Sequence, residues 1–175
     1  MNRTLKTILD RALKSDKRGS DGLRTRALNM ATNNFNTVSL TLFSSLSEHF
    51  PEDAALRTLK QELAGYSSPL CKDTVTPAIN FFSMTYQTKF DCRPISDLIL
   101  AQEESLFAQD SKVHIPQLDL IKFKEKWAAL SQPEKDSVWQ YMKILTPLSA
   151  AVMYLHTTTD EELSAMLHKT QTPKL

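Results

Sequence analysis

The sequence predicts an all-α protein, a single-domain helical bundle of about six to eight helices. Only three glycines stand beside eight prolines, and so few glycines argue against a sheet protein rich in tight turns. Apolar residues recur at helical spacing along most of the chain. The chain has 175 residues, of which 41% are hydrophobic and 23% charged. It is therefore long enough for one core and too short to favour two domains.

We expect three regions: a basic N-terminal helix with a flexible joint over residues 1–22, a helical domain over 23–170, and a frayed tail over 171–175. The first helix should run from Arg3 to Lys14, because its apolar residues share one helical face. They are Leu5, Ile8, Leu9, Ala12 and Leu13. The polar stretch SDKRGSDG that follows is typical of a loop.

Apolar residues between Leu23 and Phe50 also recur at helical spacing, and they predict a long helix. The residues between them are rich in Asn, Ser, Thr and Val, which are poor helix formers. Tertiary packing would have to hold this helix together, or it breaks near Asn33–Asn36. A strand over Thr37–Phe43, where apolar residues alternate, is the competing interpretation.

Pro51, Glu52 and Asp53 predict the opening turn of the next helix. Proline and acidic residues suit this position because the first N–H groups of a helix have no intrahelical partner and carry partial positive charge. Gly65 is the predicted end of this helix. A connector follows, and another helix is expected with Pro77 near its start.

The chain is then expected to turn between Asp91 and Pro94. Ser96 opens a short helix that we extend to Phe107, because apolar residues continue at helical spacing. The segment QDSKVHIPQ, residues 109–117, predicts an exposed loop.

The strongest local signal is a helical hairpin between Leu118 and Leu155. Ser131 and Glu134 have the spacing of a capping box, and Pro133 lies in the first turn between them. The serine oxygen can accept a hydrogen bond from a free backbone N–H, while the glutamate accepts one from the N–H of the cap residue. The pattern therefore predicts the start of the second hairpin helix.

Pro147 should kink this second helix, because proline lacks an N–H and crowds the carbonyl one turn back. Thr159 and Glu162 repeat the capping-box spacing and predict a last short helix. No internal repeat or low-complexity tract is evident.

The leading functional hypothesis is a non-enzymatic helical interaction or structural protein that acts through protein–protein contacts. Its basis is the group of aromatic residues on the hairpin. These side chains either complete the core or form a hot spot for a partner helix. The candidate partner-binding residues are Trp139, Tyr141 and Trp127.

A second hypothesis rests on uneven charge. The net charge is +1, but residues 1–26 carry eight basic and three acidic side chains, a net +5 that leaves −4 for the remainder. Such a segment can bind nucleic acid or an anionic surface, or it can be a solvated helix face. No helix-turn-helix signature is present, so contact would be with phosphates rather than with bases. The candidate nucleic-acid-binding residues are Arg3, Lys6, Arg11, Lys14, Lys17, Arg18, Arg24 and Arg26.

The sequence carries no signature of a metal, cofactor or nucleotide site. The patterns GxGxxG, GxxxxGK[ST] and ExxH are absent, and the two cysteines and four histidines lack zinc-ligand spacing. We predict no metal, no cofactor and no enzymatic activity. The enzyme hypothesis that remains takes Cys71 as a nucleophile in a loop before a helix. We expect reduced cysteines, with a disulfide between Cys71 and Cys92 as the alternative.

The longest apolar stretch, from Leu148 to Leu155, is far shorter than the roughly 20 residues that span a bilayer. The first residues lack the apolar core of a secretory signal, because Asp10 lies where that core would be. We therefore expect no membrane span and a location in the cytoplasm or nucleus. A protein partner is expected first and nucleic acid second. The sequence does not indicate an oligomeric state.

The segment FKEKWAALSQPEKDSVWQYMKILTPLSA resembles a pattern near the C-terminus of small helical proteins of large DNA viruses that infect algae and other protists. The upstream segment LSEHFPEDAALRTLKQELAG resembles their companion segment. The resemblance implies a viral or virus-like helical protein inside the host cell. It assigns no activity and no functional residue.

Overall fold

The computed structural model of the protein describes residues 3–15, 22–68 and 70–171. Its fold confirms the predicted all-α class. The described residues form nine α-helices, because one predicted helix is interrupted at Lys122. The helices are α1 (Arg3–Ser15), α2 (Leu23–His49), α3 (Ala54–Tyr66), α4 (Thr76–Phe82), α5 (Ile95–Ala101), α6 (Pro116–Leu120), α7 (Phe123–Ala129), α8 (Gln132–Thr157) and α9 (Asp160–Gln171). The shorter elements are η1 (Ser83–Gln87), β1 (Lys89–Phe90), β2 (Arg93–Pro94) and η2 (Glu104–Leu106).

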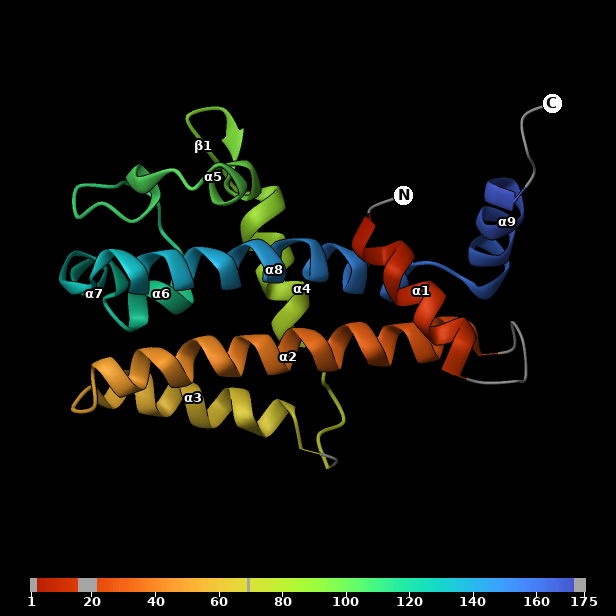
Figure 1. The fold of residues 1–175 in the computed structure, drawn as a ribbon, viewed down its shortest axis with the longest axis horizontal. Coiled ribbons are helices and arrows are strands. Elements are labelled where there is room, and N and C mark those ends of the chain that lie inside the picture. Colours follow the sequence, from red (N-terminus) through yellow and green to blue (C-terminus); the bar gives the residue numbers. More distant parts are fainter. Residues whose placement is uncertain (1–2, 16–21, 69, 172–175) are drawn as a thin grey trace.

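Two long helices, α2 and α8, run antiparallel through the middle of the fold (Figure 1). Helix α1 packs against both of them, α3 packs along α2, and α4 and α5 pack against α8. Leu5, Ile8, Leu9 and Ala12 of α1 are buried in the same core as the apolar faces of α2 and α8. The N-terminal helix is therefore part of the core of the helical domain. Residues 16–21, in the predicted joint, and residues 172–175, in the predicted tail, lie outside the described residues.

Helix α2 runs without a break for 27 residues, so the predicted long helix is confirmed. The alternatives, a break near Asn33–Asn36 and a strand over Thr37–Phe43, are wrong. Packing overrides the low helix propensity of this stretch. Asn36 is buried, and its side-chain Nδ2 donates a hydrogen bond to the carbonyl of Thr74 at 3.0 Å. Thr41 donates its hydroxyl hydrogen bond to a carbonyl one turn back. The polar side chains thus have partners that are compatible with a helix.

The start of α3 differs from the prediction. Asp53 is the N-cap, and its carboxylate accepts a hydrogen bond from the N–H of Leu56 at 2.8 Å. Pro51 and Glu52 precede the helix in a turn, because the cap hydrogen bond defines the first helical residue. Gly65 lies inside α3, which continues to Tyr66.

Asp53 also connects α3 to α7. Its carboxylate pairs with the ammonium of Lys126, which is buried at 8% exposure. Lys126 donates a second hydrogen bond to the carbonyl of Ile121 and lies over the ring of Phe50, 5.6 Å from its centroid. A buried lysine is tolerated here because it is paired and hydrogen-bonded.

The predicted turn between Asp91 and Pro94 is present as the end of a small hairpin, in which β1 pairs antiparallel with β2. Asp91 and Cys92 have positive φ angles, as a tight two-residue hairpin turn requires. Helix α5 ends at Ala101, well before the predicted Phe107, because Gln102 adopts the left-handed conformation.

The predicted exposed loop over residues 109–117 is only partly exposed. Val113 and Ile115 are buried in the core, and α6 begins at Pro116. The first arm of the predicted hairpin is also interrupted, because Lys122 has a positive φ of 48° between α6 and α7. Two short helices therefore replace one longer helix.

Both capping boxes are confirmed. The backbone N–H of Ser131 donates to Glu134 at 2.6 Å at the start of α8. At the start of α9, Thr159 N–H donates to Glu162 at 3.0 Å, and Glu162 N–H donates to the threonine hydroxyl at 3.2 Å. Helix α8 continues past Pro147 to Thr157.

Replacing Asp53 by Asn keeps a cap acceptor for Leu56 but removes the charge that faces Lys126. The hydrogen bond from Lys126 and that from the Leu56 N–H hold the pKa of Asp53 below its ordinary value of 3.8. This contribution to stability is complete above that pH and is lost as the pH falls through the lowered pKa. We expect Asp53→Asn to be less stable than the wild type at neutral pH, and the difference in stability to be smaller at about pH 3, below the ordinary pKa of the carboxyl.

Urea denaturation at both pH values measures this difference. The matched control is Glu52→Gln, which changes an adjacent exposed carboxylate. A stability gap for Asp53→Asn that stays constant from neutral pH to acid would contradict the role of its charge.

Candidate functional site

The two tryptophans that we predicted as partner-binding residues lie in the core. Trp139 is 1% exposed and Trp127 is 3% exposed. Their ring centroids are 5.4 Å apart, and both rings contact Phe107 at less than 5 Å. The indole Nε1 of Trp127 donates a hydrogen bond to Glu104 at 3.0 Å. The partner-binding prediction for both tryptophans is therefore corrected, because a partner cannot contact them in the folded protein.

Tyr141 is only half-buried. It lines a small pocket of about 200 Å³ between α2 and α8, together with His49 and Glu134. The Nδ1 of His49 lies 2.9 Å from the Glu134 carboxylate. The backbone N–H and the hydroxyl of Ser131 are the main groups that lower the pKa of Glu134, and His49 adds to their effect. The pair joins the end of α2 to the start of α8.

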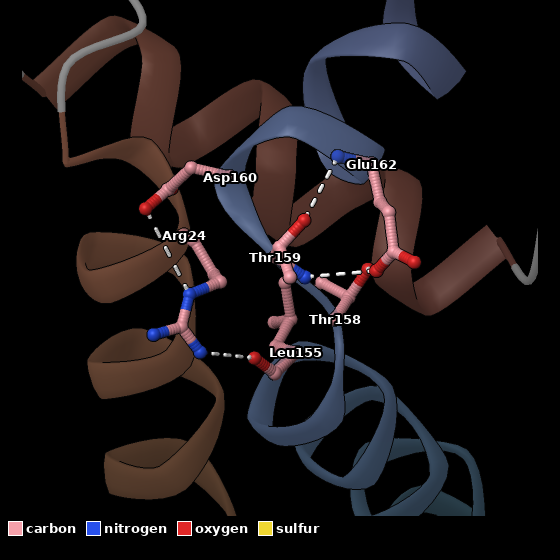
Figure 2. A network of polar contacts seen from close by, with 6 residues as sticks. All are labelled: Arg24, Leu155, Thr158, Thr159, Asp160 and Glu162. Carbon is pink, nitrogen blue, oxygen red and sulfur yellow. Dashed lines mark hydrogen bonds and ion pairs between the residues drawn. The ribbon is translucent and has the colours of Figure 1, made fainter.

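Arg24 has a structural role in the fold. Its Nη1 donates to the carbonyl of Leu155 at 3.0 Å, and its Nε lies 4.0 Å from the carboxylate of Asp160 (Figure 2). The carbonyl belongs to the last turn of α8, where a cation is favourable because the carbonyls there carry partial negative charge. Figure 2 also shows the capping contacts of Thr159 and Glu162 beside it. Arg24 therefore supports the fold, and its assignment to nucleic acid stays a prediction.

Of the other predicted basic residues, Lys6, Lys14 and Arg26 do not line the groove that Arg3 and Arg11 share. Arg26 lies close to Gly22, with its Nη1 3.6 Å from the point that a Cβ would occupy there. Lys6 and Lys14 are exposed on α1. Lys17 and Arg18 lie outside the described residues.

Arg3 and Arg11 lie together at an open groove of about 530 Å³ between α1, α2 and α8. The third cation of this groove, Lys143, comes from α8. No acidic residue of the described chain lines the groove. We call it the α1–α8 groove.

The walls of the α1–α8 groove contain both polar and apolar side chains. Thr7 and Asn34 supply polar groups, and Ile144 is an apolar side chain that remains 47% exposed. Arg3, Arg11 and Lys143 make no side-chain ion pair with another residue in the described part of the chain. Their charges are therefore available to an anion in solution.

Sequence reasoning missed Lys143. The residue is far from the basic N-terminal segment in the chain, and only the packing of α1 against α8 places it in the same groove. A lysine on a polar helix face carries no local signal of such a neighbour.

The two cysteines are not linked to each other. Cys71 and Cys92 are free thiols, so the disulfide alternative is wrong. The described residues contain no group of histidines, cysteines and carboxylates that could hold a metal ion. Among the helices that the structure describes, none has the length and apolar character to cross a bilayer.

No protein-family model, curated protein or solved structure matches the chain. The resemblance to viral helical proteins therefore stays a prediction.

Replacing Trp139 by Ala should destabilise the protein by about 3–5 kcal/mol, because it empties a core site between aromatic rings. Urea denaturation measures the free energy of unfolding. Ile144→Ala on the same helix is the control, with an expected loss below about 1 kcal/mol because this side chain is half-exposed. Equal losses for the two variants would contradict the core assignment.

Replacing Arg24 by Gln should lower the free energy of unfolding by about 1 kcal/mol, because a charged hydrogen bond at the end of α8 is lost. Binding to nucleic acid should not change, since Arg24 is absent from the residues lining the α1–α8 groove. Lys14→Gln, at an exposed position of α1, is the control for stability. Weaker nucleic-acid binding by Arg24→Gln at unchanged stability would mean that Arg24 contacts nucleic acid and does not support the fold.

Proposed function

We propose that the protein is a non-enzymatic binding module that holds the phosphate backbone of single-stranded nucleic acid in the α1–α8 groove. The observation that carries this proposal is the meeting of Arg3, Arg11 and Lys143 around one groove without an acidic residue in its described lining. Cations arranged in this way attract phosphates and release counterions from the nucleic acid.

The shape of the site favours a strand over a flat surface. A concave groove follows the backbone of a flexible strand, whereas a membrane surface needs an exposed face that can lie against it. No aromatic side chain is present in the described lining, so bases have no stacking platform. Binding should therefore depend on phosphates and show little sequence preference.

The burial of both tryptophans leaves the hairpin without its expected hot spot, so it does not favour protein–protein contact there. A location in the cytoplasm or nucleus, as we expected from the sequence, would bring the protein together with nucleic acid. The viral resemblance is compatible with such a role.

The triple variant Arg3→Gln, Arg11→Gln and Lys143→Gln should weaken binding of a fluorescent oligothymidine by about tenfold or more at low salt. For the wild type, the plot of log affinity against log salt concentration should have a slope of about −2, the value for three contacts to a single strand. The slope for the triple variant should approach zero. Fluorescence anisotropy over a range of KCl concentrations measures both quantities.

The control is a triple variant with the same change in charge, Lys6→Gln, Lys14→Gln and Lys112→Gln, at exposed positions that do not line the groove. It should retain most of the affinity. Equal weakening by the two triple variants would mean that general surface charge attracts the strand. If the protein bound phosphatidylserine vesicles more tightly than the oligothymidine, and through the same three groove residues, the ligand of the groove would be a membrane surface and the nucleic-acid proposal would be wrong.

A further inference from the structure

A further concave site lies on another face of the α2–α8 pair. It is a pocket of about 240 Å³ with walls from α2, α3 and α4, and Met142 and Leu145 of α8 at its base. Aromatic side chains make up much of the wall, and Phe35 and Phe81 are in edge-to-face contact with their centroids 5.6 Å apart. We call it the α2–α4 pocket. Most of its surface is apolar, as in sites that bind small molecules.

The polar residues of the described lining are Ser39, Glu62, Tyr66 and Asn80, and of these Ser39 is the buried one. Ser39 lines the α2–α4 pocket and is 4% exposed, yet its hydroxyl makes no hydrogen bond with another described residue. Two other hydroxyls of α2, those of Thr41 and Ser47, each donate to a carbonyl one turn back at 2.8 Å. A hydroxyl beside a cavity that has no protein partner can bond to a water molecule or to a ligand there. Ser39 is therefore the group that would orient a ligand.

The rim determines the charge that a ligand can carry. Glu62 is the only charged residue in the described lining of the α2–α4 pocket, and its side chain is exposed. It forms no ion pair with another residue that the structure places. A carboxylate beside an apolar opening repels an anion and attracts a cation. A ligand in the α2–α4 pocket would therefore meet a carboxylate and no cation among the described lining residues.

We infer that the α2–α4 pocket binds a compact aromatic molecule, neutral or cationic, whose hydrogen-bonding group reaches Ser39. The size of the cavity suits a molecule of two or three rings. This binding does not depend on the proposed nucleic-acid function, because the α2–α4 pocket and the α1–α8 groove share no lining residue.

Two fluorescent probes with the same aromatic skeleton test the proposal. N-phenyl-1-naphthylamine is neutral and carries one N–H, and 8-anilinonaphthalene-1-sulfonate adds a negative charge to the same skeleton. We expect saturable binding of the neutral probe at one site. In competition with the neutral probe at that site, the sulfonate should bind at least about fivefold more weakly, whatever its binding to the cationic α1–α8 groove. In Glu62→Gln this ratio should fall, because the repelling charge is gone. An unchanged ratio would overturn the role of Glu62.

Two changes at Ser39 locate the site. Ser39→Leu fills the cavity and should abolish binding of the neutral probe, whereas Ser39→Ala keeps the volume and should weaken binding by about two- to tenfold. Ser47→Leu, two turns along α2 and outside the described lining, is the matched control and should bind as the wild type does. Unaltered binding by folded Ser39→Leu, or by Ser39→Ala if the larger variant fails to fold, would overturn the proposal.

Discussion

The antiparallel pairing of α2 and α8 is the constraint on which the rest of the structure depends. A polar contact closes each end of the pair: Arg24 bonds to Leu155 at one end, and His49 pairs with Glu134 at the other. Between them the apolar faces of the two helices meet in the core. The polar contacts set the register, while burial of apolar area supplies most of the stability.

The α1–α8 groove and the α2–α4 pocket both follow from this pairing. Two long helices in contact leave a furrow on each side of their contact line, and shorter helices pack beside each furrow. On one side α1 brings two arginines toward Lys143 and forms the α1–α8 groove. On another face α3 and α4 surround an apolar space and form the α2–α4 pocket. The charge of the two sites differs because α1 is basic, whereas a carboxylate is the only charged group among the described residues that line the α2–α4 pocket.

Local patterns predicted the helix starts well and the helix ends less well. The capping boxes at Ser131 and Thr159 form as expected, because their hydrogen bonds join residues three apart and need no other element. The end of α5 at Ala101 and the interruption at Lys122 were missed. Each depends on a non-glycine residue with positive φ, which a propensity pattern does not indicate because surrounding packing must hold it.

The sequence by itself determined the all-α class, the order of most helices, the caps and the basic character of the N-terminal segment. These features depend on spacing within one helix or on hydrogen bonds within one turn. Tertiary structure alone decided that α2 is continuous, that Trp127 and Trp139 are buried, and that Lys143 joins Arg3 and Arg11. These outcomes depend on contacts between residues far apart in the chain, because only the packing of whole helices decides which side chains become neighbours.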